Sequence, residues 1–89
     1  MVDWKLVYAE QARKDAKKLA AQGLKPKAEH PLSILKANPY QTPPPFEKLV
    51  GDLSGANSRR INIKLRLVYQ ILDGIRTVKI IRMWTQYGR

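Results

Sequence analysis

The sequence predicts an α+β fold: an N-terminal strand, two helices, and then an antiparallel sheet of three to four strands with the helices packed on one face. Three observations lead to this prediction. Apolar residues alternate with a period of two near the N-terminus, then recur at helical spacing, and alternate again over residues 60–71. Elements in this order bury their apolar sides when the helices form one layer and the sheet the other.

The first half of the chain carries the strand and the two helices. Every second residue is apolar over residues 2–8, which predicts a half-buried strand. Residues 10–22 place small and apolar side chains opposite lysines at helical spacing, and Gly23 is the expected stop. A second helix is predicted for residues 26–38. Because a proline inside a helix costs about 3 kcal/mol, Pro31 requires this helix to be kinked or to begin near that residue.

The second half begins with a proline-rich connector and continues as strands. Residues 40–46 contain three consecutive prolines and predict a semi-rigid extended segment. Strand-like residues follow at 49–53, between turn residues. Over residues 60–71 the odd positions are apolar and the even positions polar, with Val68 as the exception. This pattern predicts one long strand with a packed face and a basic face.

A hairpin is expected to close the sheet. Asp73-Gly74 is a favoured two-residue turn, and residues 75–84 supply the returning strand. A turn of this length places Leu67 opposite Ile80, Tyr69 opposite Val78, and Arg66 beside Ile81.

Length and composition restrict the function. The 89 residues suffice for a single domain, residues 1–89, with one modest core. The absence of cysteine excludes a disulfide scaffold, a thiolate metal site and a cysteine nucleophile, and it fits a reducing cytoplasm. No apolar run approaches the ~20 residues that cross a bilayer. We expect an unprocessed cytoplasmic protein that needs no cofactor and does not contact a membrane.

The charge of the chain indicates its class of partner. The net charge is +10, and the basic residues occur in both halves of the chain. Such a surface attracts polyanions, so nucleic acid or an acidic protein is the expected partner. The alternative is a basic surface that only keeps the protein solvated.

The long alternating strand supplies the best candidate for phosphate binding. Arg60, Lys64 and Arg66 share its polar face in the prediction, and the arginine fork binds phosphate through two donors. The alternative is a solvated sheet face, which needs polar residues in any case. Glu47 lies between the connector and the sheet and suits a general base, or else is an ordinary surface glutamate. His30, the only histidine, is not expected to be catalytic.

Other enzyme classes find no support in the sequence. It contains no glycine-rich phosphate loop, no nucleophilic serine in a sharp-turn motif, and no paired acidic or histidine spacing for a metal.

Four segments resemble the distinctive segments of the Txe/YoeB toxins of the RelE/ParE superfamily. They are Asn38-Pro39, Pro44-Pro45-Phe46-Glu47-Lys48-Leu49, Leu53-Ser54-Gly55-Ala56-Asn57-Ser58-Arg59-Arg60-Ile61 and Arg66-Leu67-Val68-Tyr69. The third and fourth segments, at their spacing, are the most specific. The resemblance covers about half of the chain by motif and the whole chain by the order of its elements.

This resemblance implies a metal-independent endoribonuclease, the toxin of a type II toxin-antitoxin system, which cleaves mRNA in the ribosomal A site by attack of the 2′-hydroxyl on the phosphodiester. It implies Glu47 as the base and Arg66 as a catalytic arginine, with Gln86 and Tyr87 at the C-terminal catalytic positions. The candidate RNA and phosphate contacts are Arg59, Arg60, Lys64 and Arg82. Strand alternation favours Arg60 over Arg59, because Arg60 shares the polar face with Arg66.

The C-terminus departs from the family pattern. Gln86 stands where relatives have the histidine that acts as general acid, and Leu65 stands where relatives often have another histidine. Glutamine forms hydrogen bonds but cannot deliver a proton. We therefore expect weakened or rearranged chemistry, with Tyr87, an arginine or a ribosomal group assisting the leaving oxygen, or an attenuated relative.

The resemblance also implies partners and leaves two alternatives. An acidic antitoxin of the Phd/YefM type is expected to cover the basic groove, and a homodimer is a further expectation. One alternative is a toxin of the ParE type, which has the same fold but inhibits DNA gyrase; Glu47 and Arg66 argue against it. The other alternative is an RNA-binding or DNA-binding module without catalysis.

Overall fold

The computed structural model describes residues 3–43, 45–49 and 55–86, the last three of these by their backbone only. The elements, in chain order, are β1 (Lys5–Tyr8), α1 (Glu10–Ala21), α2 (Lys25–Ala37), β2 (Glu47–Lys48), β3 (Asn57–Arg60), β4 (Leu65–Leu72), the 3₁₀ turn η2 (Asp73–Ile75) and β5 (Thr77–Gln86). This order confirms the predicted α+β class.

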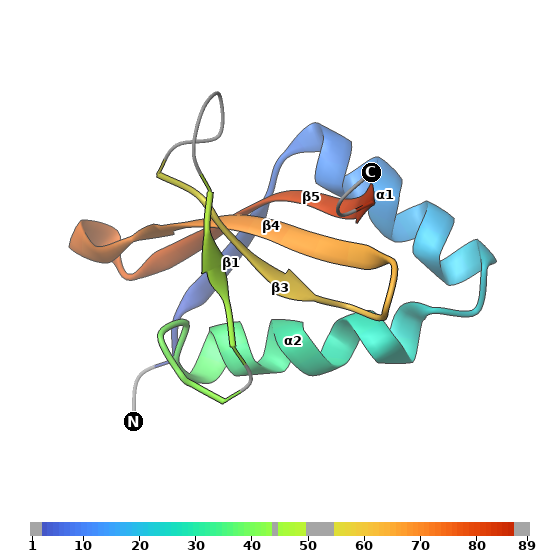
Figure 1. The fold of residues 1–89 in the computed structure, drawn as a ribbon. Coiled ribbons are helices and arrows are strands. Elements are labelled where there is room, and N and C mark those ends of the chain that lie inside the picture. Colours follow the sequence, from blue (N-terminus) through green and yellow to red (C-terminus); the bar gives the residue numbers. More distant parts are fainter. Residues whose placement is uncertain (1–2, 44, 50–54, 87–89) are drawn as a thin grey trace.

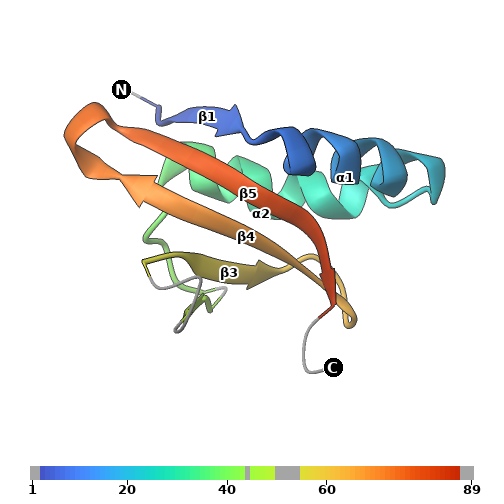
Figure 2. The same ribbon diagram turned by 90° about the horizontal axis from the view of Figure 1, so that it is seen from above.

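The strands form one five-stranded sheet in the order β1-β5-β4-β3-β2. The pairs from β5 to β2 are antiparallel, as predicted, whereas β1 lies parallel to β5 at the edge, so the sheet is mixed. Both helices lie on the same side of the sheet (Figures 1 and 2). The parallel pairing arises because α1 and α2 follow β1 directly and cover one face before the chain enters the other four strands.

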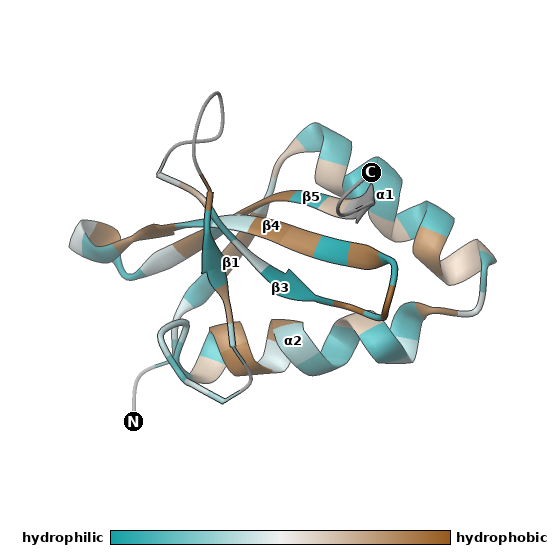
Figure 3. Cartoon of the chain, in the orientation of Figure 1, coloured by the Kyte–Doolittle hydropathy of each residue, from teal (hydrophilic) through white to brown (hydrophobic). Residues whose placement is uncertain are grey.

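The core lies between the helices and the sheet, where apolar positions of both layers meet (Figure 3). Its buried members come from the start of the chain, both helices and the two long strands: Trp4, Ala12, Leu19, Ala28, Leu35, Ile61, Leu65, Leu67, Tyr69, Val78, Ile80 and Met83. Within the described ranges, neither helix has the length and apolar character needed to cross a lipid bilayer.

The helices follow the sequence pattern closely. Glu10 lies in the first turn of α1, where a carboxylate favours the positive end of the helix dipole. After α1, Gly23 adopts a left-handed φ of 71°, and the amide of Leu24 donates to the carbonyl of Leu19 at 2.9 Å. This is the predicted glycine stop. The second helix begins at Lys25, six residues before Pro31, so it does not start at that proline. Pro31 is buried inside α2, where packing offsets the hydrogen bond that proline cannot donate.

The segment predicted as one strand, residues 60–71, is divided by a turn at residues 61–64, between the end of β3 and the start of β4. The Asn62 side-chain oxygen accepts hydrogen bonds from the amides of Lys64 (2.9 Å) and Leu65 (2.8 Å), which bends the chain between β3 and β4. As a result Ile63, predicted to be buried, is 78% exposed. The prediction of one long strand was therefore wrong, although the core positions from Leu65 to Tyr69 were correct.

The hairpin after β4 is wider than the two-residue turn predicted. Leu72 pairs with Thr77, and the loop of residues 73–76 contains a 3₁₀ turn and Arg76 with a left-handed φ of 48°. Contacts outside the hairpin fix this loop, since the Tyr40 hydroxyl donates to the Asp73 carboxylate at 2.7 and 2.8 Å.

The wider loop changes the predicted cross-strand pairs. Tyr69 pairs with Ile80, and Ile71 pairs with Val78, so both predicted core pairs are shifted by two residues. A shift of two keeps every side chain on its predicted face. A bulge adds to the shift further along, and Arg66 pairs with Thr85 instead of lying beside Ile81.

Candidate active site

A cavity of about 370 Å³ lies where α2, the proline-rich connector and strands β2 to β4 meet. It combines one acid, one histidine and three arginines from distant parts of the sequence. Its lining residues are His30, Pro31, Pro45, Glu47, Arg59, Arg60 and Arg66. Four of the residues predicted for catalysis or phosphate binding therefore meet in one place.

Glu47 and Arg66 form the centre of this cavity. Arg66 Nη1 lies 3.5 Å from Glu47 Oε1 and donates a hydrogen bond to Ser58 Oγ at 3.2 Å. The pairing of the strands explains the geometry, because Glu47 stands opposite Ser58 on β3 and Arg60 stands opposite Arg66 on β4. The Arg66 side chain is only 9% exposed, whereas that of Glu47 is 50% exposed. The Glu47 carboxylate is thus accessible to a ligand, while the Arg66 guanidinium is buried and held by its hydrogen bond to Ser58.

Arg60 lies at the open side of the cavity, and Lys64 lies beyond it. Arg60 is exposed and lines the cavity, and it shares a face with Arg66 as predicted. The reason differs from the prediction, since the two residues face each other across two strands. Lys64 lies exposed in the turn between those strands and does not line the cavity. The predicted open face with three cations in a row was therefore wrong, because Arg66 is buried and Lys64 lies outside the sheet.

Arg59 is buried in the wall of the cavity and braces the connector. Its side chain is almost fully buried, with a residue exposure of 1%. Arg59 Nη2 donates to the carbonyls of Pro39 (2.9 Å) and Gln41 (2.8 Å), and its Nε donates to the Tyr69 hydroxyl (3.1 Å). The guanidinium also lies 4.8 Å from the Phe46 ring centroid. Burial raises the pKa of Tyr69, and the neighbouring Arg59 acts against that rise.

Arg82 is not brought to the cavity. Its Nε lies 2.9 Å from Asp15 Oδ2, an oxygen that also accepts from the amide of Met83 at 2.9 Å. Asp15 therefore ties α1 to the bulged part of β5. Burial alone would raise the pKa of Asp15, but hydrogen bonds from Arg82, Met83 and Gln11 outweigh burial and hold this pKa below its usual value.

The two C-terminal candidates are described in part or not at all. The backbone of Gln86 pairs with Leu65 at the end of β5, one residue beyond the position where Arg66 pairs with Thr85. The end of β5 therefore lies beside Leu65 and Arg66 of β4, although the Gln86 side chain lies outside the described atoms. Tyr87 lies outside the described residues.

His30 is the cavity residue that sequence reasoning missed. It lies on α2, far from the motifs in the second half of the chain, and its neighbour Pro31 gave no reason to expect a functional position. No sequence pattern connects His30 with Glu47, because the two residues come to one cavity only in the folded chain.

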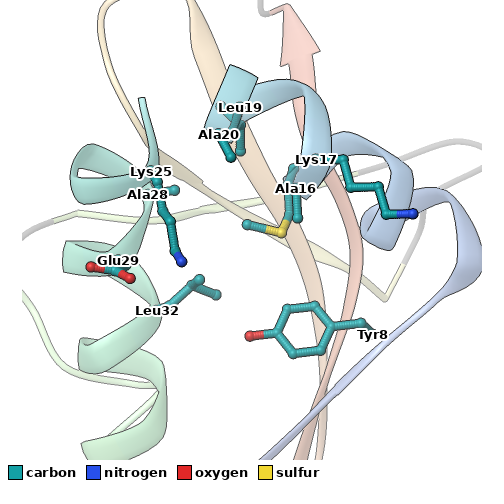
Figure 4. Close-up of a pocket in the computed structure, with 10 residues that line it drawn as sticks. Tyr8, Ala16, Lys17, Leu19, Ala20, Lys25, Ala28, Glu29 and Leu32 are labelled. Carbon is teal, nitrogen blue, oxygen red and sulfur yellow. The ribbon is translucent and has the colours of Figure 1, made fainter. Parts of the chain in front are cut away.

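A second cavity, also of about 370 Å³, lies between α1 and α2 and has a different character (Figure 4). Its walls are mainly apolar, with Leu19, Leu32 and the Tyr8 ring turned toward the space between the helices. Burial raises the pKa of Tyr8. This second cavity shares no lining residue with the Glu47 cavity, so it contains none of the charged groups described above.

The arrangement around Glu47 suits chemistry at a phosphate. A carboxylate can accept a proton from a hydroxyl group, and neighbouring guanidinium groups can stabilise negative charge that develops on a phosphate. Among the described residues no group of three or more histidine, cysteine or acidic side chains could hold a metal ion. The groups in the cavity that can take part in such chemistry are the carboxylate, the histidine and the arginines.

Comparisons with known proteins place this fold in a family. No protein-family model and no curated protein sequence matches the chain. The YoeB/ParE toxin from Agrobacterium tumefaciens matches with a TM-score of 0.81 and 25% identity, covering 93% of this chain and 99% of that one. A YoeB-YefM toxin-antitoxin complex from Staphylococcus aureus matches with a TM-score of 0.72 and 30% identity, covering 94% and 98%.

A third solved structure, the toxin-antitoxin complex RelBE2 from Mycobacterium tuberculosis, matches with a TM-score of 0.73 and 28% identity over 96% of this chain and all of the other. These matches extend over nearly the full length of both chains. The protein therefore belongs to the YoeB branch of the RelE superfamily, the toxins of toxin-antitoxin pairs.

Proposed function

We propose that this toxin is a ribosome-dependent endoribonuclease that cleaves mRNA in the ribosomal A site without a metal ion and so inhibits translation. The observation that carries the proposal is the pairing of an accessible carboxylate, Glu47, with a guanidinium held 3.5 Å away, Arg66, inside a cavity of about 370 Å³. A ribose and its phosphate fit a space of this size, and the cavity supplies a base and cations together.

The proposed reaction begins at the ribose 2′-hydroxyl. Glu47 accepts the hydroxyl proton, and the 2′-oxygen forms a bond to the adjacent phosphorus. The bond from phosphorus to the 5′-oxygen of the next nucleotide then breaks. The products are a 2′,3′-cyclic phosphate and a 5′-hydroxyl end, and the leaving 5′-oxygen takes up one proton.

The arginines stabilise the charge that this step creates. Arg66 is held by Ser58 and Glu47, so its fork is oriented before the substrate binds. Arg60 lies at the open side, where it can contact a phosphate of the bound strand. Arg59 adds positive potential from the wall, although the three donations described above go to oxygen atoms of the protein.

The remaining predicted residues take lesser roles in the proposal. Lys64 can contact the RNA backbone beyond the cavity from the turn that follows β3. Gln86 and Tyr87 are assigned to the side of the leaving group on the strength of the resemblance. Arg82 is left out of the RNA-binding set because its guanidinium binds Asp15.

An acidic antitoxin is the proposed protein partner. One of the similar structures is a complex of YoeB with YefM, and another is a RelBE2 toxin-antitoxin complex. The +10 net charge of this chain suits an acidic segment of the Phd/YefM type that covers the Glu47 cavity. A YoeB dimer is also among the similar structures, so a homodimer is part of the proposal.

A purified translation system tests the proposal. Ribosomes stalled with a defined A-site codon are mixed with the toxin, and cut ends are mapped by primer extension. We expect cuts in the A-site codon, no cuts in the same mRNA without ribosomes, and unchanged cutting in the presence of a chelator restricted to transition metals. Uncut mRNA with inhibited DNA supercoiling would favour gyrase inhibition, and binding without either effect would favour a non-catalytic module.

A further inference from the structure

His30 faces the same cavity as Glu47 from a different element. His30 and Pro31 line the cavity from α2, whereas Glu47 and Arg66 line it from β2 and β4. The His30 side chain is exposed, and its backbone carbonyl accepts a hydrogen bond from the Ser33 hydroxyl at 2.9 Å within the helix. His30 is therefore an exposed residue that contributes to the lining of the cavity.

The reaction proposed above requires an acid as well as a base. When the bond to the 5′-oxygen breaks, that oxygen must receive a proton, because an alkoxide is a poor leaving group. In an in-line displacement the attacking and leaving oxygens lie on opposite sides of the phosphorus. His30 lines the cavity from α2 and Glu47 lines it from β2, so the two residues meet a bound phosphate from different elements.

The chemistry of the lining residues narrows the choice of acid. Arginine stays protonated at any physiological pH, so Arg59, Arg60 and Arg66 cannot deliver the proton. Glu47 is the base in the same step. Histidine is the side chain type that exchanges protons near neutral pH, and His30 is the only one in the chain.

We propose that His30 is the general acid that protonates the leaving 5′-oxygen. This assignment rests on the proposed ribonuclease function. In the reaction, His30 in its imidazolium form gives one proton to the 5′-oxygen while Glu47 takes one from the 2′-hydroxyl, so the number of protons on the enzyme is unchanged. The charged residues that line the cavity with His30 are Glu47, Arg59, Arg60 and Arg66, and a bound phosphate would add a negative charge among them.

A sulfur-substituted substrate distinguishes the role of the general acid from that of the general base. The mRNA carries a 5′-bridging phosphorothiolate at the cut position, where sulfur replaces the leaving oxygen. A thiol is far more acidic than an alcohol, so a thiolate leaves without being protonated. We expect the His30→Gln variant to cut ordinary mRNA about 10² to 10⁴-fold more slowly than the wild type. The same variant should cut the phosphorothiolate mRNA at nearly the wild-type rate.

Two controls accompany this experiment. Glu47→Gln should slow the cutting of both substrates, because the base is needed whichever atom leaves. Glu29→Gln, the neighbouring position on α2, lines only the other cavity and should cut both at the wild-type rate.

The outcomes distinguish this inference from the proposed function. Wild-type cutting with an unaffected His30→Gln variant would overturn the role of His30 alone. Equal slowing of both substrates by His30→Gln would also overturn it, because that pattern indicates lost binding or folding. A wild type that cuts no mRNA on ribosomes would overturn both proposals.

Discussion

Arg60 and Arg66 stand directly opposite each other on β3 and β4, so two positive charges occupy one cross-strand pair. Like charges in this position destabilise a sheet. Glu47 offsets part of the repulsion through its ion pair with Arg66, but its own side chain is half exposed, which weakens that compensation. A pair that costs stability and lines a cavity is expected where an anion binds.

Replacing Arg60 should therefore separate stability from RNA binding. We expect Arg60→Thr to raise the free energy of unfolding by about 0.5 kcal/mol at low salt, since the repulsion is removed and threonine suits a strand. The same variant should bind RNA less tightly, with the slope of log affinity against log salt reduced by about 0.7. Urea unfolding and fluorescence anisotropy with single-stranded RNA measure the two effects. A variant that is less stable and binds RNA normally would contradict this interpretation.

The orientation of Arg66 should matter more than its charge. Arg66→Lys keeps the positive charge but loses the planar fork that contacts Ser58 and Glu47. We expect the single-turnover cutting rate to fall by about 10²-fold while RNA affinity changes little. Arg13→Lys, an exposed change on α1, is the matched control and should leave the rate unchanged. Equal rates for both variants would show that Arg66 is not oriented for the reaction.

Arg59 should prove structural. Arg59→Lys loses the donation to the Tyr69 hydroxyl and cannot replace both donations to the connector carbonyls, so we expect a loss of about 2 kcal/mol in the free energy of unfolding. Tyr69→Phe should cost about 1 kcal/mol by leaving the Arg59 Nε without that acceptor. Combining the two substitutions should cost less than their sum, because they remove one shared hydrogen bond. Strict additivity in urea unfolding would contradict the assignment.

Asp15 should make stability depend on pH in the acid range. Its folded pKa is lowered, so the ionised carboxylate stabilises the fold above the unfolded pKa of about 4, and this contribution is lost as pH falls through the folded value. Asp15→Asn lacks the contribution and should be less stable by about 2 kcal/mol at neutral pH.

Measurements of unfolding across pH test this prediction. The difference between wild type and Asp15→Asn should be constant near neutrality and shrink below about pH 4. A difference that persists unchanged in strong acid would show that Asp15 acts through its shape and not its charge.

Much of the fold could be predicted from the sequence because local patterns and tertiary packing agree there. The order of elements, the Gly23 stop and the core positions of β4 all follow from periodicity and backbone preference. The strand predicted across residues 60–71 failed because the Asn62 side chain forms a turn, a signal hidden by the alternation of apolar residues around it. The Asp73 turn failed because Tyr40, a distant residue, binds its carboxylate.

The site residues that lie within one continuous stretch of motifs could be predicted from the sequence, and those outside it could not. The segment around Glu47 and the strands carrying Arg60 and Arg66 are close in the sequence, so a pattern could connect them. The burial of Arg59 could not be predicted, because the connector carbonyls that surround it come from another part of the chain. The position of His30 at the Glu47 cavity depends on how α2 packs, and no local spacing in the sequence indicates that packing.

The central claim is that the Glu47 carboxylate takes the proton that starts RNA cleavage. The most direct measurement is the single-turnover rate on A-site mRNA for wild type, Glu47→Gln and the control Glu29→Gln, with the cut ends analysed chemically. We predict 2′,3′-cyclic phosphate ends at equal rates for wild type and Glu29→Gln, and a rate about 10² to 10⁴-fold lower for Glu47→Gln, in a variant that remains folded. Cutting by Glu47→Gln at the wild-type rate would contradict the account.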